Sequence, residues 1–185
     1  MNSRSRIELL VGILATFALT ALSLAAVVFL GPQRTGGGNA YTAGCAAPVL
    51  AGTVVNVAGA DMGGPMMGGP GRRGAMRLTA DQATVPHGPV GFVFANAGRY
   101  AHELVILPLP GTQIAGSRPV GGDGKIDETG SLGEASATCA EGTGRGVLPR
   151  SVGWVSVDLP PGRYELVCNF PGHYAAGMYT QLTVT

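Results

Sequence analysis

Ionisable side chains are scarce in this chain. Only 12% of its 185 residues are charged, and 12 Lys and Arg against 11 Asp and Glu leave a net charge of +1. Such a chain has neither the basic field that attracts nucleic acid nor an acidic tail. Strong helix formers are also scarce beyond the N-terminus, whereas Gly (31 residues) and Pro (13) are abundant. This balance predicts one domain of short strands joined by many turns, with accessory segments at its ends.

A long apolar run occurs once, at residues 9–30. About 20 helical residues cross a bilayer core of roughly 30 Å, so residues 1–30 are interpreted as an N-terminal signal anchor containing one transmembrane helix. Arg4 and Arg6 precede the run and favour a cytoplasmic N-terminus. A cleaved secretory signal is the alternative, although the run is long for one and no small-x-small cleavage site follows. Both interpretations predict a domain on the extracytoplasmic side of the plasma membrane, in the first case as a single-pass protein.

Cysteine is limited to Cys45, Cys139 and Cys168. Disulfides persist in exported proteins, and an odd number of cysteines leaves one sulfur unpaired. Cys168 lies between a predicted strand and a loop that contains a histidine, so we interpret it as the functional one. Cys45 and Cys139 then form a candidate disulfide, with two unpaired surface thiols as the alternative.

The remainder of the chain divides by composition. Residues 31–49 form a Gly-rich linker, and residues 50–185 form the predicted domain. Within this domain, residues 61–74 (DMGGPMMGGPGRRG) are of low complexity and predict a mobile loop. Residues 112–149 are a long insertion rich in Gly, Ser and Glu, and the sequence does not indicate which structure it adopts.

Apolar alternation with a period of two predicts most of the strands. The predicted strands are 53–57, 91–96, 102–107, 153–159, 163–168 and 178–184, with 76–78 as a shorter candidate. Short strands separated by Pro and Gly turns indicate an all-β fold, a β-sandwich of Greek-key type. Tyr164 follows a turn at the start of a late strand, where it is either the tyrosine that ties a corner through its hydroxyl or an ordinary core residue.

The strongest chemical signal is the segment CNFPGHYAAGM at residues 168–178. It places a thiolate, an imidazole and a thioether on one loop, as Cys168, His173 and Met178. Two His and one Cys in a trigonal plane with a distant axial Met define a blue-copper site. The second His must come from elsewhere, and only His87 and His102 remain. His102 precedes an apolar strand whereas His87 sits in a Pro-His-Gly-Pro turn, so His102 is the predicted ligand.

Each of these residues has an ordinary structural interpretation when taken alone. A single His, Met or Cys at a strand end is most often a packed core residue, but the combination within one loop favours a metal site. Zinc is the rival metal, and structural zinc requires four strong nitrogen or sulfur ligands. A thioether is a poor ligand for zinc and a good one for Cu(I), so the donor set favours copper.

At this point the sequence resembles a known family. The run GRYELVCNFPGHYAAGM and the upstream FANAGRYAHELVI are similar to the cupredoxins, and most similar to the sulfocyanin-like blue-copper proteins, over roughly residues 50–185. The resemblance implies a Greek-key β-sandwich that carries one type 1 copper ion. It also implies a set of site residues, with His102, Cys168, His173 and Met178 as ligands and Asn96 and Asn169 as residues that brace them.

The function implied by this resemblance is single-electron transfer between membrane or extracytoplasmic redox partners, without enzymatic activity. A cytochrome or a haem-copper oxidase is the partner expected by analogy. An apolar collar around His173 is the predicted contact surface, formed by Phe170, Pro171, Tyr174, Ala175 and Ala176.

Other copper functions are distinguished by their ligand requirements. A multicopper enzyme needs more than three His, and a dinuclear copper centre needs two cysteines in one loop. The remaining alternative is an extracytoplasmic protein that stores or delivers copper, with thioethers as weak Cu(I) ligands. The candidate thioethers lie in or beside the low-complexity loop and are Met62, Met66, Met67 and Met76. If they bind no Cu(I), the loop is interpreted as a mobile segment only.

Overall fold

The computed structural model describes residues 45–61 and 76–185. The predicted transmembrane helix at residues 9–30, the linker as far as residue 44 and residues 62–74 of the Met- and Gly-rich loop therefore lie outside the described residues. Within the part that is described, no helix is long and apolar enough to cross a membrane.

The first of two sheets has four strands in the order β2-β1-β4-β7. These strands are β1 (Thr53–Ala60), β2 (Arg77–Ala80), β4 (Gly88–Asn96) and β7 (Val152–Leu159). β1 runs parallel to β4, and β2 and β7 are antiparallel to their neighbours. Because β1 and β4 are parallel, Asp61 after β1 and Asn96 at the end of β4 emerge at the same end of the sheet.

The second sheet has five strands in the order β3-β9-β8-β5-β6. These strands are β3 (Thr84–Val85), β5 (Leu104–Pro108), β6 (Gly133–Ala135), β8 (Gly162–Val167) and β9 (Tyr179–Val184). β8 is antiparallel to both β5 and β9. The start of β5, the end of β8 and the start of β9 therefore meet at one end of this sheet, where His102, Cys168 and Met178 lie.

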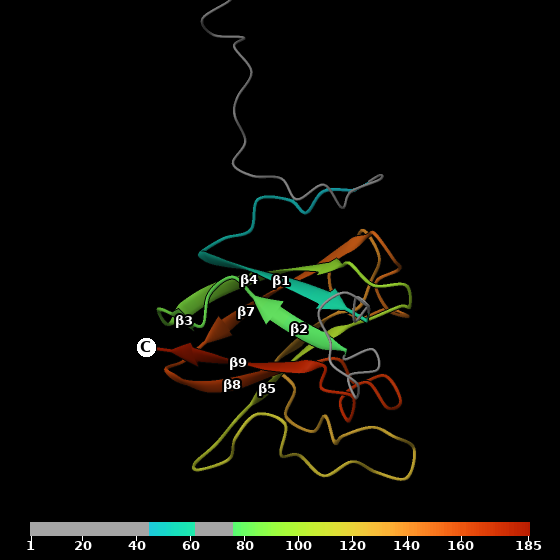
Figure 1. Cartoon of the computed structure of the whole chain (residues 1–185). Coiled ribbons are helices and arrows are strands. Elements are labelled where there is room, and N and C mark those ends of the chain that lie inside the picture. The colour runs from blue at the N-terminus through green and yellow to red at the C-terminus, as the bar shows by residue number, and fades with distance from the viewer. Residues whose placement is uncertain (1–44, 62–75) are drawn as a thin grey trace, which may run out of the picture. The chain divides into compact units, whose positions relative to one another are not determined.

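The two sheets share one hydrophobic core, which confirms the predicted all-β sandwich (Figure 1). Val55 and Phe92 enter the core from the first sheet, and Leu104 and Leu166 from the second. Cys168 and Met178 belong to the same buried cluster. The metal donors therefore lie where the core reaches one end of the sandwich, with Cys168, His102 and Met178 buried and His173 partly exposed.

The strand that begins at Gly162 is tied to the preceding turn by a tyrosine. The Tyr164 hydroxyl donates a hydrogen bond of 2.7 Å to the carbonyl of Pro160, and the side chain is only 4% exposed. This is the corner tie that the sequence offered as one of two alternatives.

The first part of the insertion at residues 112–149 covers the outer face of the second sheet, on the side away from the first sheet (Figure 1). Its last part runs beside β7 of the first sheet, where the Cys139 N–H donates to the Val152 carbonyl at 2.7 Å. Ile126 of this insertion packs with Val105, Val167 and Tyr174 in a second buried cluster. Apart from β6, the insertion consists of turns and irregular segments, with one isolated bridge inside it (Val120 with Ile126) and two to residues outside it (Val147 with His102, and Glu141 with Trp154). The first part of the insertion therefore packs against the outer face of the second sheet.

Candidate metal centre

Three donor atoms converge at the end of the sandwich. His102 Nδ1 lies 3.2 Å from His173 Nδ1, and Cys168 Sγ lies 3.3 Å from His173 Nδ1 and 3.9 Å from His102 Nδ1. Three donors in a plane, each about 2.0–2.3 Å from a common ion, lie roughly 3.5–4.0 Å apart. The observed distances reach this range or fall a few tenths of an ångström below it, so the three donors are close enough to share one ion. Within the described residues, these three form the one group of His, Cys, Asp or Glu side chains able to share a metal ion.

Met178 is adjacent to these donors through its backbone. Its N–H donates to the His173 carbonyl at 3.1 Å, and its carbonyl accepts from the Cys168 N–H at 3.0 Å. The side chain is fully buried in the cluster that contains Cys168. Gly59 of β1 leaves room for it, since a Cβ at that position would approach the Met178 methyl to 3.0 Å.

The Cys168 sulfur is buried and held by the backbone. The Glu103 N–H points at Sγ from 3.4 Å, which fixes the sulfur beside the residue that follows His102. Burial raises the pKa of the Cys168 thiol to about 12. A positive ion among the donors reverses this preference, because a coordinating thiol is deprotonated.

Both imidazoles are kept neutral by their surroundings. Burial lowers the pKa of His102, and burial together with the neighbouring His102 lowers the pKa of His173. A neutral imidazole retains the ring lone pair that a metal needs. His102 is fully buried, whereas His173 is partly exposed, so His173 is the ligand nearer to solvent.

Asn96 braces the turn that leads into His102. Its side-chain nitrogen donates to the carbonyls of Tyr100 and Val147 at 2.7 Å, and its oxygen accepts from the Gly98 N–H at 2.8 Å. Val147 in turn pairs with His102 through two backbone hydrogen bonds. Asn96 therefore supports the backbone next to a proposed ligand.

Asn169 anchors the insertion to the loop that carries the other donors. Its side chain exchanges hydrogen bonds with the N–H and carbonyl of Ile126 at 2.8 and 3.0 Å. Its backbone N–H donates to the Glu103 carboxylate at 3.1 Å. Burial raises the pKa of Glu103 to about 7, with Glu134 and Glu128 adding to the shift.

Three residues that contact the donors or the loop that carries them were not predicted from the sequence. Asp61 was grouped with the low-complexity loop, but its carboxylate lies 3.2 Å from His102 Nε2. Glu165 belongs to a predicted strand and should face outward, but it is fully buried because the insertion covers that face. Glu103 directly follows a predicted ligand, and this adjacency was the one available signal.

Other predicted features lie away from the donors or differ in their exposure. His87 is exposed, and its ring bonds to the Thr185 carbonyl, as expected for a turn residue. Pro171, Ala175 and Ala176 are exposed beside His173, in agreement with the predicted collar. Tyr174 is not part of the collar, because it is only 2% exposed and its hydroxyl donates to Glu165.

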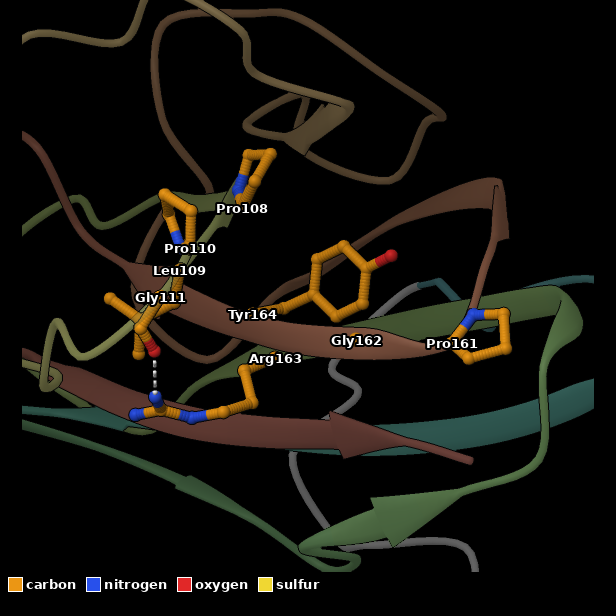
Figure 2. Close-up of a pocket in the computed structure, with 8 residues that line it drawn as sticks. All are labelled: Pro108, Leu109, Pro110, Gly111, Pro161, Gly162, Arg163 and Tyr164. Carbon is orange, nitrogen blue, oxygen red and sulfur yellow. Dashed lines mark hydrogen bonds between the residues drawn. The ribbon is translucent and has the colours of Figure 1, made fainter.

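A hollow of about 380 Å³ lies at the other end of β5 and β8 (Figure 2). It is lined by residues 108–111 and 161–164, and the Arg163 guanidinium donates across it to the Gly111 carbonyl at 3.0 Å. Five residues of extended strand, roughly 17 Å, separate Arg163 from Cys168. The hollow is therefore separate from the metal donors.

Comparisons with known proteins agree with the chemistry of these donors. Residues 82–185 match a protein-family profile described as the sulfocyanin (SoxE) domain. No match was found among curated proteins.

Several solved structures are similar in fold at low identity. A reduced auracyanin from the photosynthetic bacterium Roseiflexus castenholzii is 22% identical, with a TM-score of 0.46 over 72% of this chain and 96% of that one. Rusticyanin from Thiobacillus ferrooxidans is 24% identical, with a TM-score of 0.41 over 72% and 79% of the two chains. Auracyanin B is 21% identical, with a TM-score of 0.45 over 77% and 95%.

Proposed function

Since this chain belongs to the sulfocyanin (SoxE) domain family, whose members are type 1 copper proteins of the cupredoxin class, we propose that it transfers single electrons. In this proposal His102, Cys168 and His173 bind the copper ion in a plane and Met178 is the axial ligand. The observation that carries it is the convergence of Cys168 Sγ with two imidazole Nδ1 atoms, between 3.2 and 3.9 Å apart, at the buried end of the sandwich.

Copper bound to these donors supplies a one-electron couple between Cu(I) and Cu(II). The chain's own contribution is to keep the donors in place while the charge changes. His102 and Cys168 are held by backbone hydrogen bonds to Val147 and Met178, and the sulfur accepts from the Glu103 N–H. A site fixed in this way needs little rearrangement when an electron enters or leaves, which suits a carrier rather than an enzyme.

Electrons are proposed to pass through His173 to a protein partner. His173 is the partly exposed ligand, and exposed Pro171, Ala175 and Ala176 surround it with an apolar rim. Small interfaces of this kind are typical of transient redox encounters. A cytochrome or a haem-copper oxidase is the proposed partner class.

The proposed location is the extracytoplasmic side of the plasma membrane, with residues 9–30 as the anchor. The disulfide between Cys45 and Cys139 supports an oxidising compartment. The hydrophobicity and length of residues 9–30 support the anchor.

Copper loading of the purified protein tests the proposal directly. We expect an intense blue absorption band on addition of Cu(II), because the Cys168 thiolate becomes a ligand. Cys168→Ser should abolish the band, whereas His87→Ala should retain it, since His87 lies outside the donor cluster. Uptake of Cu(II) without colour, or a band that survives in Cys168→Ser, would contradict the assignment.

Voltammetry of the loaded protein separates an electron carrier from a copper delivery protein. We expect reversible one-electron cycling without loss of metal. Rapid transfer of Cu(I) to a metal-free acceptor would instead favour storage or delivery. Met76, the one candidate thioether among the described residues, is partly buried against the hydrophobic core.

A further inference from the structure

Asp61, the residue directly after β1, has a buried carboxylate that faces His102. Its Oδ2 lies 3.2 Å from His102 Nε2, and the two side chains are 1% and 0% exposed. The same oxygen accepts hydrogen bonds from the backbone N–H groups of Arg99 at 2.6 Å and Tyr100 at 2.8 Å. One carboxylate thus contacts both the ring of His102 and the turn that precedes it.

This contact determines which ring nitrogen of His102 carries the hydrogen. Nδ1 faces His173 and Cys168, so it must keep its lone pair to act as a metal donor. The hydrogen of the neutral ring then lies on Nε2, where the Asp61 carboxylate accepts it. A histidine ligand whose other nitrogen donates to a carboxylate is held in both tautomer and orientation.

The backbone around this pair is shaped to allow the contact. A Cβ at Gly98 would lie 2.5 Å from Asp61 Oδ2 and 2.7 Å from His102 Nε2. Only glycine leaves this space open, and the Gly98 N–H is itself held by the Asn96 side chain at 2.8 Å. Asp61 directly after β1 and Asn96 at the end of β4 therefore hold the same turn from the ends of two neighbouring strands.

We propose that Asp61 is a positioning residue that holds His102 in its metal-binding tautomer and lowers the reduction potential of the centre. The second half of this proposal rests on the proposed copper site. A negative charge buried beside a ligand favours the more positive metal state, Cu(II), over Cu(I). The carboxylate does so without entering the coordination sphere.

The test compares Asp61→Asn with Asp61→Ala in the full chain. Asp61→Asn retains an oxygen that can accept hydrogen bonds but removes the charge, and Asp61→Ala removes both. Asp81→Asn is the matched control, because the exposed Asp81 carboxylate accepts hydrogen bonds from Asn56 of β1, the strand that precedes Asp61. Asn56 is separated from Asp61 by roughly 16 Å of extended strand.

Two measurements are needed. Voltammetry of the copper-loaded protein should show a higher potential in Asp61→Asn, by at least the equivalent of a tenfold change in the one-electron equilibrium, about 59 mV. Nitrogen chemical shifts of the metal-free protein should show a single His102 tautomer, with hydrogen on Nε2, in the parent and mixed tautomers in Asp61→Ala. Asp81→Asn should match the parent in both measurements.

The outcomes separate this proposal from the proposed function. A folded Asp61→Asn protein with an unchanged potential would overturn the effect on potential, and a single unchanged tautomer in Asp61→Ala would overturn the positioning role. If Asp61→Ala fails to fold, the nitrogen chemical shifts of His102 are measured in Asp61→Asn instead. They should differ from those of the parent because the Nε2 hydrogen bond is weaker, and unchanged shifts would overturn the positioning role. If the parent binds no copper, the proposed function fails, while the tautomer of the metal-free protein still tests the positioning role.

Discussion

Gly59 shows how one missing side chain shapes the end of the core. It lies on β1 opposite Met178 and the ring of Phe94. A Cβ there would come within 2.8 Å of the Phe94 ring and 3.0 Å of the Met178 methyl. The position of the proposed axial ligand thus depends on a residue far from it in sequence.

Gly59→Ala should push Met178 away from its position and strain the packing around it. Overpacking of this kind costs typically about 1–3 kcal/mol, so we expect the free energy of unfolding to fall by that amount. If Met178 is the axial ligand, the visible and electron paramagnetic resonance spectra of the copper-loaded protein should also change. Chemical denaturation and these spectra provide the measurements.

Gly122→Ala is the control for this prediction. Gly122 is exposed in the insertion, and a Cβ there would meet no atom within 4 Å. The Gly122→Ala protein should have the same free energy of unfolding and the same copper spectra as the parent. A Gly59→Ala protein that loses stability with unaltered copper spectra would argue against Met178 as a ligand.

At the scale of elements, the insertion at residues 112–149 is attached to the loop that carries Cys168, His173 and Met178. Glu165 on β8 accepts hydrogen bonds from the Gly116 N–H at 2.6 Å, the Tyr174 hydroxyl at 2.8 Å and Arg118 Nε at 2.6 Å. Further along, the Gly172 N–H donates to the Gly124 carbonyl at 2.8 Å. The insertion therefore supports the loop from outside the sandwich.

Glu165→Ala should loosen the insertion and the metal-binding loop together. Removing one partner of a buried ion pair costs about 3–5 kcal/mol, and the Tyr174 hydroxyl also loses its acceptor. We expect faster hydrogen exchange both in the backbone around Arg118 and in residues 170–178. Glu141→Ala, at an exposed position of the same insertion, should change neither region. Faster exchange confined to the insertion would show that the loop does not depend on this contact.

Sequence patterns predicted most of the strands because their alternation is local. β1, β4, β7, β8 and β9 lie where apolar alternation placed them, with ends that differ by a few residues. The predicted strand at 102–107 begins at Leu104 instead, because His102 forms only an isolated bridge to Val147. β3 and β6 contain only two and three residues, too few for a period to be visible.

The candidate site was predictable only where its residues share a motif. Cys168, His173 and Met178 are within one loop, and the scarcity of His left few choices for the second imidazole. Asp61 gave no signal, since it is 41 residues from His102 and opens a segment of low complexity. Glu165 was misleading, because alternation alone places it on a face that the insertion covers.

At the scale of the whole molecule, a disulfide joins the chain ahead of β1 to the insertion. Cys45 and Cys139 are bonded, with Cα atoms 5.5 Å apart and a sequence separation of 94, which confirms the predicted pairing. Cys168 is the free, buried cysteine among the described residues, which leaves its sulfur available for a metal. The cross-link closes a loop that contains His102, whereas Cys168, His173 and Met178 lie beyond it in sequence.

Cys45→Ser and Cys139→Ser should therefore lower the free energy of unfolding equally and without additivity. In the chain-entropy model, closing a loop of about 100 residues contributes roughly 4–5 kcal/mol, and either substitution removes all of it. The double variant should then be no less stable than each single one. Serine is the appropriate replacement at Cys139, whose φ of 56° lies in the left-handed region, since both side chains carry a Cβ and incur the same backbone strain. Denaturant titrations of the three variants measure this, with a thiol count on the unfolded parent, where one reactive thiol is expected. Additive losses, or three thiols in the parent, would mean that the cross-link does not form in the protein.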